Sequence, residues 1–257
     1  LALAVVREAL MYSSAHLDSL FGMQGVGSYS LSMGGSEELK AAWLPKVAAL
    51  EAIAGLALTE PDVGSDLRAI TTTIERRGGG PVVRGRKSFI TNGGAAAFYC
   101  VLGKEDGGYS MVLVPASAAG LTAERGADII APHILGELTF DDVVVPDANR
   151  LGEPGKAFSL MLQTLAVFRV TVAGSGVGLG QAAVDEATAH ATTRTQFGRP
   201  LLELGAVGQN LASSWADVES ARAMTYRAAS LARTDPLSHL DHSSIAKVVA
   251  TEAAGRA

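Results

Sequence analysis

Two segments of the sequence end an apolar run on small polar residues in the same way. "LALTEPDVGSD" covers residues 56–66 and "RGRKSFITNGG" covers residues 84–94, and each places a threonine, Thr59 or Thr91, just before turn residues. Threonine hydroxyls donate and accept hydrogen bonds, and glycines leave backbone N–H groups accessible. If both threonines lie at one rim of a sheet, that rim suits a planar, heteroatom-rich ring with a phosphate tail. The alternative is that both segments are ordinary turns, because Glu-Pro-Asp and Asn-Gly are common turn sequences.

The apolar pattern around these segments predicts three domains. Residues 1–51 are expected to form an N-terminal helical domain, residues 52–150 a middle β-domain and residues 151–257 a C-terminal helical bundle. The middle region holds short apolar runs separated by Gly, Pro and Asp, which is typical of an antiparallel sandwich or barrel. The predicted fold class is therefore α+β. The seven runs cover residues 53–58, 69–75, 81–85, 87–90, 97–103, 109–115 and 137–145.

Three local signals in the helical regions give specific expectations. Ser36 is a candidate N-cap, and Pro45 is expected to break or restart the helix that follows it. Residues 22–35, "GMQGVGSYSLSMGG", are predicted to be a loop because they are rich in Gly and Ser. Residues 174–180, "GSGVGLG", lack the G-x-G-x-x-G spacing and a preceding strand, so their glycines are interpreted as helix-packing positions rather than a nucleotide loop.

Composition excludes several classes of partner. The net charge of −5 and the lack of any basic block argue against nucleic acid, because neutralising phosphates needs clustered Lys and Arg. Cys100 is the only cysteine, so no internal disulfide is expected, no metal site is predicted, and a cytoplasmic location is favoured. No apolar run reaches the roughly 18 residues that a membrane span needs. The chain starts in mid-pattern without Met and is expected to be incomplete at both ends.

Four motifs in order resemble the acyl-CoA dehydrogenase family of flavoenzymes. They are "ALTEPDVGSD" at 57–66, "GRKSFITNGG" at 85–94, "LTFDDVVVP" at 138–146 and "RTQFGRP" at 194–200. The resemblance implies an N-terminal helical domain, a middle β-domain and a C-terminal four-helix bundle, which agrees with the three predicted regions. It also implies that FAD is bound and that an acyl thioester is oxidised to its α,β-enoyl thioester.

The resemblance assigns cofactor contacts to the first two motifs. The backbone of Leu56 and Leu58 and the hydroxyl of Thr59 would meet the pyrimidine side of the flavin. Thr91 would reach the region of the flavin N5 atom. Four more residues are implied: Gly64 and Ser65 at the pyrophosphate or on the pantetheine path, and Phe89 and Ile90 flanking the ring.

The bundle region carries three further implied contacts. Arg194, with Phe197 nearby, would hold the FAD pyrophosphate of a neighbouring subunit, so a homodimer or homotetramer is expected. Arg169 would contact the CoA or carrier arm of the substrate. The alternative for Arg169 is an internal ion pair, because a cation in an apolar stretch needs a partner.

No residue in 1–257 matches the catalytic base of the family, a glutamate that removes the α-proton. Phe168 occupies the position that holds this glutamate in some relatives, and Glu60 is expected to stabilise a turn instead. Gly205 stands where relatives often have a glutamine that contacts the FAD of the neighbouring subunit. Ala166 stands near the position where relatives often have an acidic residue that meets the CoA adenine, so the acyl carrier could be CoA or an acyl-carrier protein. The electron acceptor is a protein partner or oxygen. The alternatives to a dehydrogenase are an oxygen-using flavin oxidase or monooxygenase, and a non-catalytic flavin- or acyl-binding relative.

Overall fold

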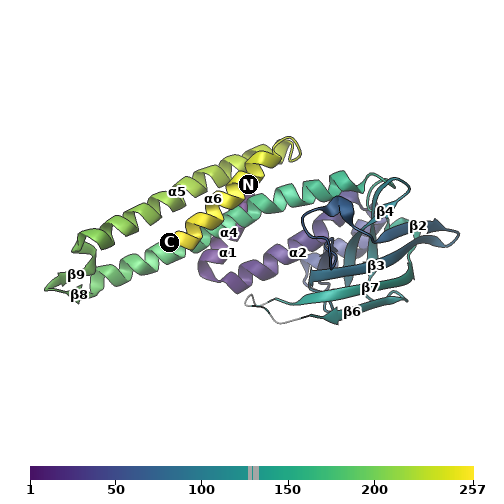
Figure 1. The fold of residues 1–257 in the computed structure, drawn as a ribbon, viewed down its shortest axis with the longest axis horizontal. Helices are drawn as coiled ribbons and strands as arrows, with labels where there is room; N and C mark the ends of the chain where they lie inside the picture. Colours follow the sequence, from purple (N-terminus) through teal and green to yellow (C-terminus); the bar gives the residue numbers. More distant parts are fainter. Residues whose placement is uncertain (127–128, 130–132) are drawn as a thin grey trace. The chain divides into compact units, whose positions relative to one another are not determined.

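A mixed β-sheet forms the core of the part of the chain from Ser19 to Thr164 (Figure 1). The computed structural model describes residues 1–126, 129 and 133–257. They divide into two units, Ser19–Thr164 and a helical unit of Leu1–Asp18 with Leu165–Ala257. The elements, in chain order, are α1 (Ala2–Ser13), α2 (Ala15–Gly34), α3 (Glu37–Ala48), β1 (Ala54–Ala57), β2 (Thr73–Arg77), β3 (Gly80–Thr91), β4 (Phe98–Glu105), β5 (Gly108–Pro115), β6 (Leu121–Arg125), β7 (Leu135–Val144), α4 (Ala157–Thr193), β8 (Thr195–Gln196), β9 (Arg199–Pro200), α5 (Gly205–Thr234) and α6 (Leu240–Arg256).

The sheet has the strand order β1-β4-β2-β3-β7-β6, and β5 pairs with the other edge of β4. Most strand pairs are antiparallel, but β4 runs parallel to β1 and, at Lys104, to β2, so the predicted antiparallel sheet is corrected to a mixed one. The predicted runs at 81–85 and 87–90 join into the single strand β3, and β6 was not predicted. The predicted α+β fold class is confirmed, while the three-domain division stays a prediction.

Residues 22–34 are helical and only Gly35 lies outside the helix, so the predicted loop over 22–35 is wrong. They form most of α2, and the small residues serve packing rather than a turn. A Cβ atom on Gly27 would lie 2.6 Å from the carbonyl carbon of Ala54, so the helix approaches the backbone of β1 as closely as only glycine allows. This tertiary contact overrides the low helix propensity of glycine.

The Ser36 prediction is confirmed, and the Pro45 prediction is wrong. The Ser36 hydroxyl accepts a hydrogen bond from the N–H of Leu39 at 3.2 Å and caps α3. Helix α3 continues through Pro45 to Ala48. Pro45 lies in the last turn of α3, and its carbonyl accepts a hydrogen bond from the N–H of Ala49 at 2.9 Å. The helix therefore lacks the one hydrogen bond that a backbone N–H at position 45 would donate.

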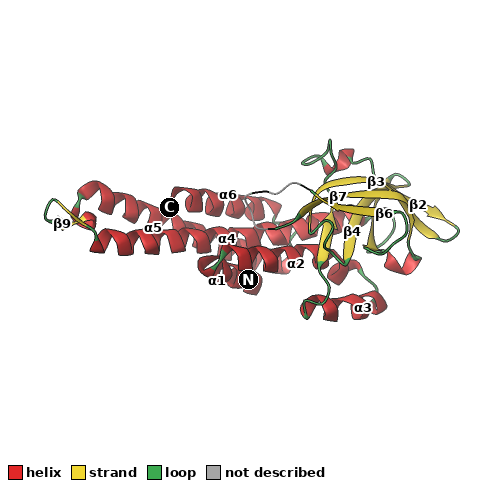
Figure 2. Ribbon diagram, turned by 90° about the horizontal axis from the view of Figure 1, so that it is seen from below, coloured by secondary structure: helices red, strands yellow, loops and turns green. Residues whose placement is uncertain are grey.

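The helical unit packs through the glycines of α4, which confirms the packing interpretation of residues 174–180. Cβ atoms on Gly174 and Gly178 would lie 2.4 and 2.1 Å from carbonyl oxygens of α1. Gly176 faces α6 in the same way, with the nearest Ala250 backbone atom at 2.9 Å. Helices α5 and α6 lie side by side in this unit (Figure 2).

Helix α4 is long and apolar enough to span a membrane by length and composition. An 18-residue window of this 37-residue helix has a mean hydropathy of 1.5, and 56% of that window is buried. Val170, Ala173 and Val177 belong to the core of the helical unit. This burial is what the core helix of a soluble protein shows, and the expected absence of a membrane span stays a prediction.

Candidate functional site

Six of the residues singled out in the sequence line one pocket of the sheet-containing unit. The pocket lies between α2, β1 and the end of β3 and has a volume of about 120 Å³. Ligand pockets typically measure about 300–1,000 Å³, so this pocket could seat one edge of a ring but not a whole dinucleotide. Its lining residues are Met23, Val26, Gly27, Ala54, Gly55, Leu56, Leu58, Thr59, Phe89, Ile90 and Thr91.

The free edge of β1 supplies backbone hydrogen-bonding groups to the pocket. Among the described strands, β1 pairs with β4 alone. Ala54 turns its backbone away from β4: its N–H donates to the Gln24 side chain and its carbonyl accepts from the Asn92 side chain, at 3.1 and 3.0 Å. Successive residues of a strand turn these groups to opposite edges, so Leu56 faces the same way as Ala54. The N–H and C=O of Leu56 therefore offer a donor and an acceptor to a ligand.

Two threonine hydroxyls lie on the pocket wall. Thr59 and Thr91 are half-buried, and neither hydroxyl has a hydrogen-bond partner within the described part of the chain. The backbone of Thr59 is bonded to β3, because the Thr59 carbonyl accepts a hydrogen bond from the N–H of Ser88 at 3.0 Å. Both hydroxyls are therefore available to bond a polar ligand.

An irregularity in β3 places the aromatic residue of the site. The pairing of β3 with β7 shifts register between Lys87 and Ile90. Phe89 sits in this bulge with φ of 57°, and its side chain is 66% exposed, while Ile90 is buried. A bulge re-aims a side chain that a regular strand would direct elsewhere, so Phe89 presents its ring at the mouth of the pocket.

A buried ion pair that the sequence reasoning missed lies behind this wall. The Lys87 side chain is fully buried, and its ammonium donates to Oε1 of Glu60 at 3.0 Å and to the carbonyl of Leu58 at 2.8 Å. Burial lowers the pKa of Lys87 to about 8, although Glu60 partly opposes this. A lysine in a strand pattern reads as solvent-facing, so only the fold reveals its role.

Glu60 is fully committed to internal partners, as expected for a turn residue. Its carboxylate accepts from the N–H and hydroxyl of Thr71, at 2.6 and 2.7 Å, and from the N–H of Thr72 at 2.9 Å. Burial alone would raise the pKa of Glu60, but the hydrogen bonds from Thr72 and Thr71 outweigh it and lower the pKa to about 2. Such a stable carboxylate is a poor proton acceptor, so Glu60 is not a general base.

The structure does not bring Gly64 and Ser65 into the pocket. Both are exposed in the loop after the turn that Glu60 and Val63 close, and a Cβ on Gly64 would meet nothing within 4 Å. Their predicted place at the FAD pyrophosphate or on the pantetheine path stays a prediction.

Three predicted residues belong to the helical unit. Arg169 is half-buried on α4 and makes no ion pair with any described residue, so the internal ion pair proposed as its alternative role is absent there. Arg194 follows α4 and opens the β8–β9 hairpin (Figure 1), and its side chain is exposed. Phe197 is at the hairpin tip, 90% exposed with φ of 52°. An arginine and a phenylalanine held out into solvent in this way can contact another molecule.

No carboxylate is among the residues that line the pocket. Phe168, at the position where some relatives of the family hold the base, is buried in α4. Neither the described lining of the pocket nor the position of Phe168 therefore supplies a proton acceptor.

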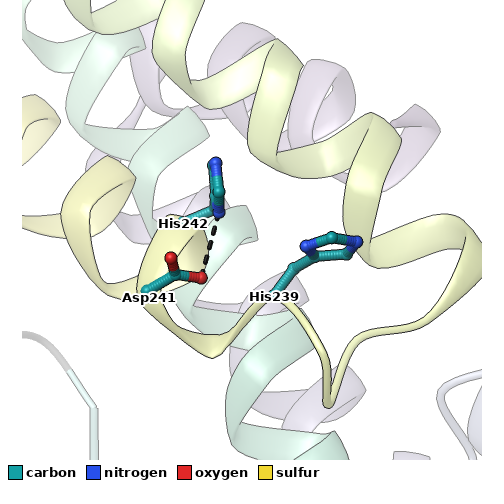
Figure 3. Close-up of side chains that lie close together, drawn as sticks. All are labelled: His239, Asp241 and His242. Carbon is teal, nitrogen blue, oxygen red and sulfur yellow. Dashed lines mark hydrogen bonds and ion pairs between the residues drawn. The ribbon is translucent and has the colours of Figure 1, made fainter.

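Three side chains of types that can bind metals lie together at the start of α6 (Figure 3). They are far from the pocket residues in the sequence. The ligand atoms of His239, Asp241 and His242 all fall within 4.8 Å of one another. His242 Nδ1 and Asp241 Oδ1 are 3.0 Å apart, and this bond lowers the pKa of Asp241. Asp241 lies in the first helical turn, where the helix dipole favours an anion and disfavours a cation. We therefore assign no metal to this cluster.

Two family models match the chain. The acyl-CoA dehydrogenase middle domain matches residues 55–143, and the acyl-CoA dehydrogenase C-terminal domain matches residues 155–257. The first of these matches contains all the pocket residues except those of α2 and Ala54.

Curated relatives and solved structures agree with these matches. The chain is 36% identical to cyclohexane-1-carbonyl-CoA dehydrogenase of Geobacter metallireducens over 81% of its own length and 57% of the relative's. It is 31% identical to glutaryl-CoA dehydrogenase of Desulfococcus multivorans, over 100% and 68% of the two lengths. A glutaryl-CoA dehydrogenase structure from Mycobacterium smegmatis, in complex with FADH2, aligns with a TM-score of 0.88 at 27% identity, covering 98% of this chain and 65% of that one.

Proposed function

The chain belongs to the acyl-CoA dehydrogenase family, and from this premise we propose that the complete protein containing it is an FAD-dependent enzyme that oxidises an acyl thioester to the α,β-enoyl thioester. The observation that carries the proposal is the pocket in which the free edge of β1 meets Thr59 and Thr91. These groups come from two separate motifs and converge on a space that fits the edge of a planar ring.

The donor set of the pocket fits the pyrimidine edge of a flavin. That edge presents carbonyl oxygens and a ring N–H, which pair with the backbone N–H and C=O of Leu56. The Thr59 and Thr91 hydroxyls add two groups that can donate or accept. The pocket seats only this edge, so the rest of the cofactor would extend over the exposed side of Phe89 and towards Gly64 and Ser65, which carry accessible backbone.

FAD supplies an acceptor for the hydride that leaves the β-carbon of the acyl chain. The residues on the pocket wall bind and orient the ring, and Phe89 shields it from water. The α-proton must pass to a base, which we assign to none of residues 1–257. Arg169 is half-buried and makes no ion pair with a described residue. It is the proposed contact for the CoA or carrier arm of the substrate, because a partly desolvated guanidinium gains from an anionic or carbonyl ligand.

The exposed β8–β9 hairpin suggests how subunits would complete the site. We propose that Arg194 donates to the FAD pyrophosphate of a neighbouring subunit and that Phe197 packs beside it. An exchange of this kind requires at least a dimer. The proposed acceptor of the electrons is a partner protein or oxygen, and the proposed location is cytoplasmic.

The test is the flavin content and redox chemistry of the complete protein. We expect about one FAD per subunit, and bleaching of the flavin absorbance when acyl-CoA esters are added without oxygen. Reoxidation in air, followed by stopped-flow absorbance, then separates a dehydrogenase from an oxidase. A complete protein that carries no flavin and takes up none from added FAD would refute the proposal.

A second candidate is a flavin-binding protein that does not dehydrogenate. It is supported by the pocket lining, which holds hydrogen-bonding groups for a ring but no carboxylate. The same experiment discriminates the two functions, because such a protein would bind FAD with normal stoichiometry and show no bleaching with any acyl thioester.

A further inference from the structure

The buried ammonium of Lys87 holds a backbone carbonyl that the sheet leaves without a partner. Leu58 follows directly after β1, and its carbonyl has no strand beside it to supply an N–H. Lys87 reaches from β3 and donates to this carbonyl at 2.8 Å. An unpartnered carbonyl in a buried position is costly, so the lysine satisfies a group that an apolar side chain would leave bare.

The same lysine fixes a longer stretch of the pocket wall. Its second bond, 3.0 Å to Glu60, ties it to a carboxylate that the Thr71 and Thr72 backbone already holds. One residue further along each segment, the N–H of Ser88 donates to the carbonyl of Thr59 at 3.0 Å. The segment 58–60 is therefore bonded to β3 at three consecutive residues, immediately before the bulge that directs Phe89 outwards.

The Lys87 bond also decides which groups remain for a ligand. With the Leu58 carbonyl occupied, the backbone groups left along this edge are the N–H and C=O of Leu56 and the N–H of Leu58. Their order is donor, acceptor, donor. It complements a ring edge that reads acceptor, donor, acceptor, which is the order of an imide.

A contribution to folding stability alone does not explain why Lys87 and Glu60 form a buried ion pair. A buried ion pair can often be replaced by apolar residues of similar volume without loss of stability, because the desolvation of two charges offsets their attraction. What an apolar pair cannot do is bond the Leu58 carbonyl. The effect specific to Lys87 is therefore that it holds the backbone of the pocket wall, Leu56–Thr59, in position.

We propose that Lys87 is a positioning residue for flavin binding: its ammonium withdraws the Leu58 carbonyl from the pocket and keeps the Leu56–Thr59 wall in the geometry that pairs with the imide edge of the ring. The inference rests on the proposed function, because it takes the ligand of this pocket to be a flavin. Lys87 touches neither the ring nor the substrate in this assignment and acts through the backbone of Leu58.

The test compares the complete protein with the double variant Glu60→Gln, Lys87→Met. The double variant removes both charges and keeps similar volumes, so it avoids the unpaired carboxylate that Lys87→Met alone would leave. Both the double variant and Glu60→Gln alone should melt below the parent, because both lose the carboxylate that Thr71 and Thr72 hold. We expect the dissociation constant for FAD to be roughly tenfold higher in the double variant than in Glu60→Gln, which keeps the ammonium that bonds the Leu58 carbonyl. The matched control is Glu105→Gln, Arg150→Met, which removes a buried pair of the same unit that does not line the pocket.

A readout without flavin keeps the inference separate from the proposed function. Hydrogen exchange of the Ser88 amide reports the bond to Thr59 in the apo protein, and we expect faster exchange in the Lys87 variant and unchanged exchange in the Arg150 control. Parent protein that binds no FAD would sink the proposed function, while this exchange result would still test the positioning. A double variant with parental FAD affinity and parental Ser88 exchange would overturn the inference.

Discussion

Replacing each pocket threonine by valine tests the orientation of the site. Valine has nearly the shape of threonine without the hydroxyl. The Thr91 hydroxyl is assigned to the N5 region of the flavin and the Thr59 hydroxyl to its pyrimidine side. We expect Thr91→Val to slow reduction of the bound flavin by substrate more than it weakens FAD binding, and Thr59→Val to show the reverse.

The structure sets the size of the effect. Neither hydroxyl has a partner within the described part of the chain, so each substitution removes no internal hydrogen bond and should leave the free energy of unfolding unchanged. Thr71 differs, because its hydroxyl donates to Glu60 at 2.7 Å. The measured change in Thr91→Val and Thr59→Val is then the lost bond to the ligand, about 0.5–1.5 kcal/mol, or roughly two- to tenfold in rate or affinity.

The assay is anaerobic single-turnover reduction at saturating FAD, run beside an FAD titration of the apo protein. Thr139→Val is the matched control, because Thr139 is a half-buried strand threonine of the same sheet that does not line the pocket. We expect parental rates and affinity for this control. If Thr91→Val loses FAD yet reduces at the parental rate when saturated, the assignment of Thr91 to N5 is wrong, and so is the assumed orientation of the ring.

Three further changes test other parts of the structure. Arg194→Ala should weaken FAD retention about tenfold, the value of a charge-assisted bond to phosphate, without lowering the melting temperature; full retention after gel filtration would argue against a shared site. Gly178→Ala places a Cβ 2.1 Å from a carbonyl of α1 and should destabilise the protein by about 1–3 kcal/mol, whereas Gly255→Ala, with nothing within 4 Å, should be neutral; equal melting temperatures would contradict the packing. Because the pKa of Glu60 falls from 4.5 to about 2 on folding, its contribution to stability is full above pH 4.5 and is lost as pH falls towards 2; Glu60→Gln should flatten acid denaturation in that window, and an unchanged profile would refute the shift.

The sequence predicted the parts of the site that depend on local chemistry. Thr59 and Thr91 end apolar runs and precede strong turn residues, so their place at strand ends followed from propensity alone. The glycines of α4 recur every four residues, which is a helical spacing, and their packing role could be read without any partner in view. Both patterns can be recognised within one segment of the sequence, and the structure confirms both.

The parts that depend on contacts between distant segments could not be read in this way. Residues 22–35 look like a loop because glycine is a poor helix former, and only the approach of Gly27 to Ala54 explains the helix. The buried Lys87 pairs with Glu60, which lies 27 residues before it in the chain. Propensity and alternation describe each segment by itself, so they cannot show which lysine a distant carboxylate will hold.

The way α2 covers the start of β1 has a consequence for what the pocket rejects. An exposed strand edge is a template that accepts any other strand, and proteins protect such edges against association. Here Gln24 occupies the N–H of Ala54 at 3.1 Å and also donates to the carbonyl of Ala52 at 2.7 Å, while Lys87 occupies the carbonyl of Leu58 at the other end. Within the described part of the chain, the open stretch of this edge is the one around Leu56, which is too short to pair with a peptide and long enough for one small ring. The edge is thereby closed to strand addition by the same side chains that shape it for a planar ligand.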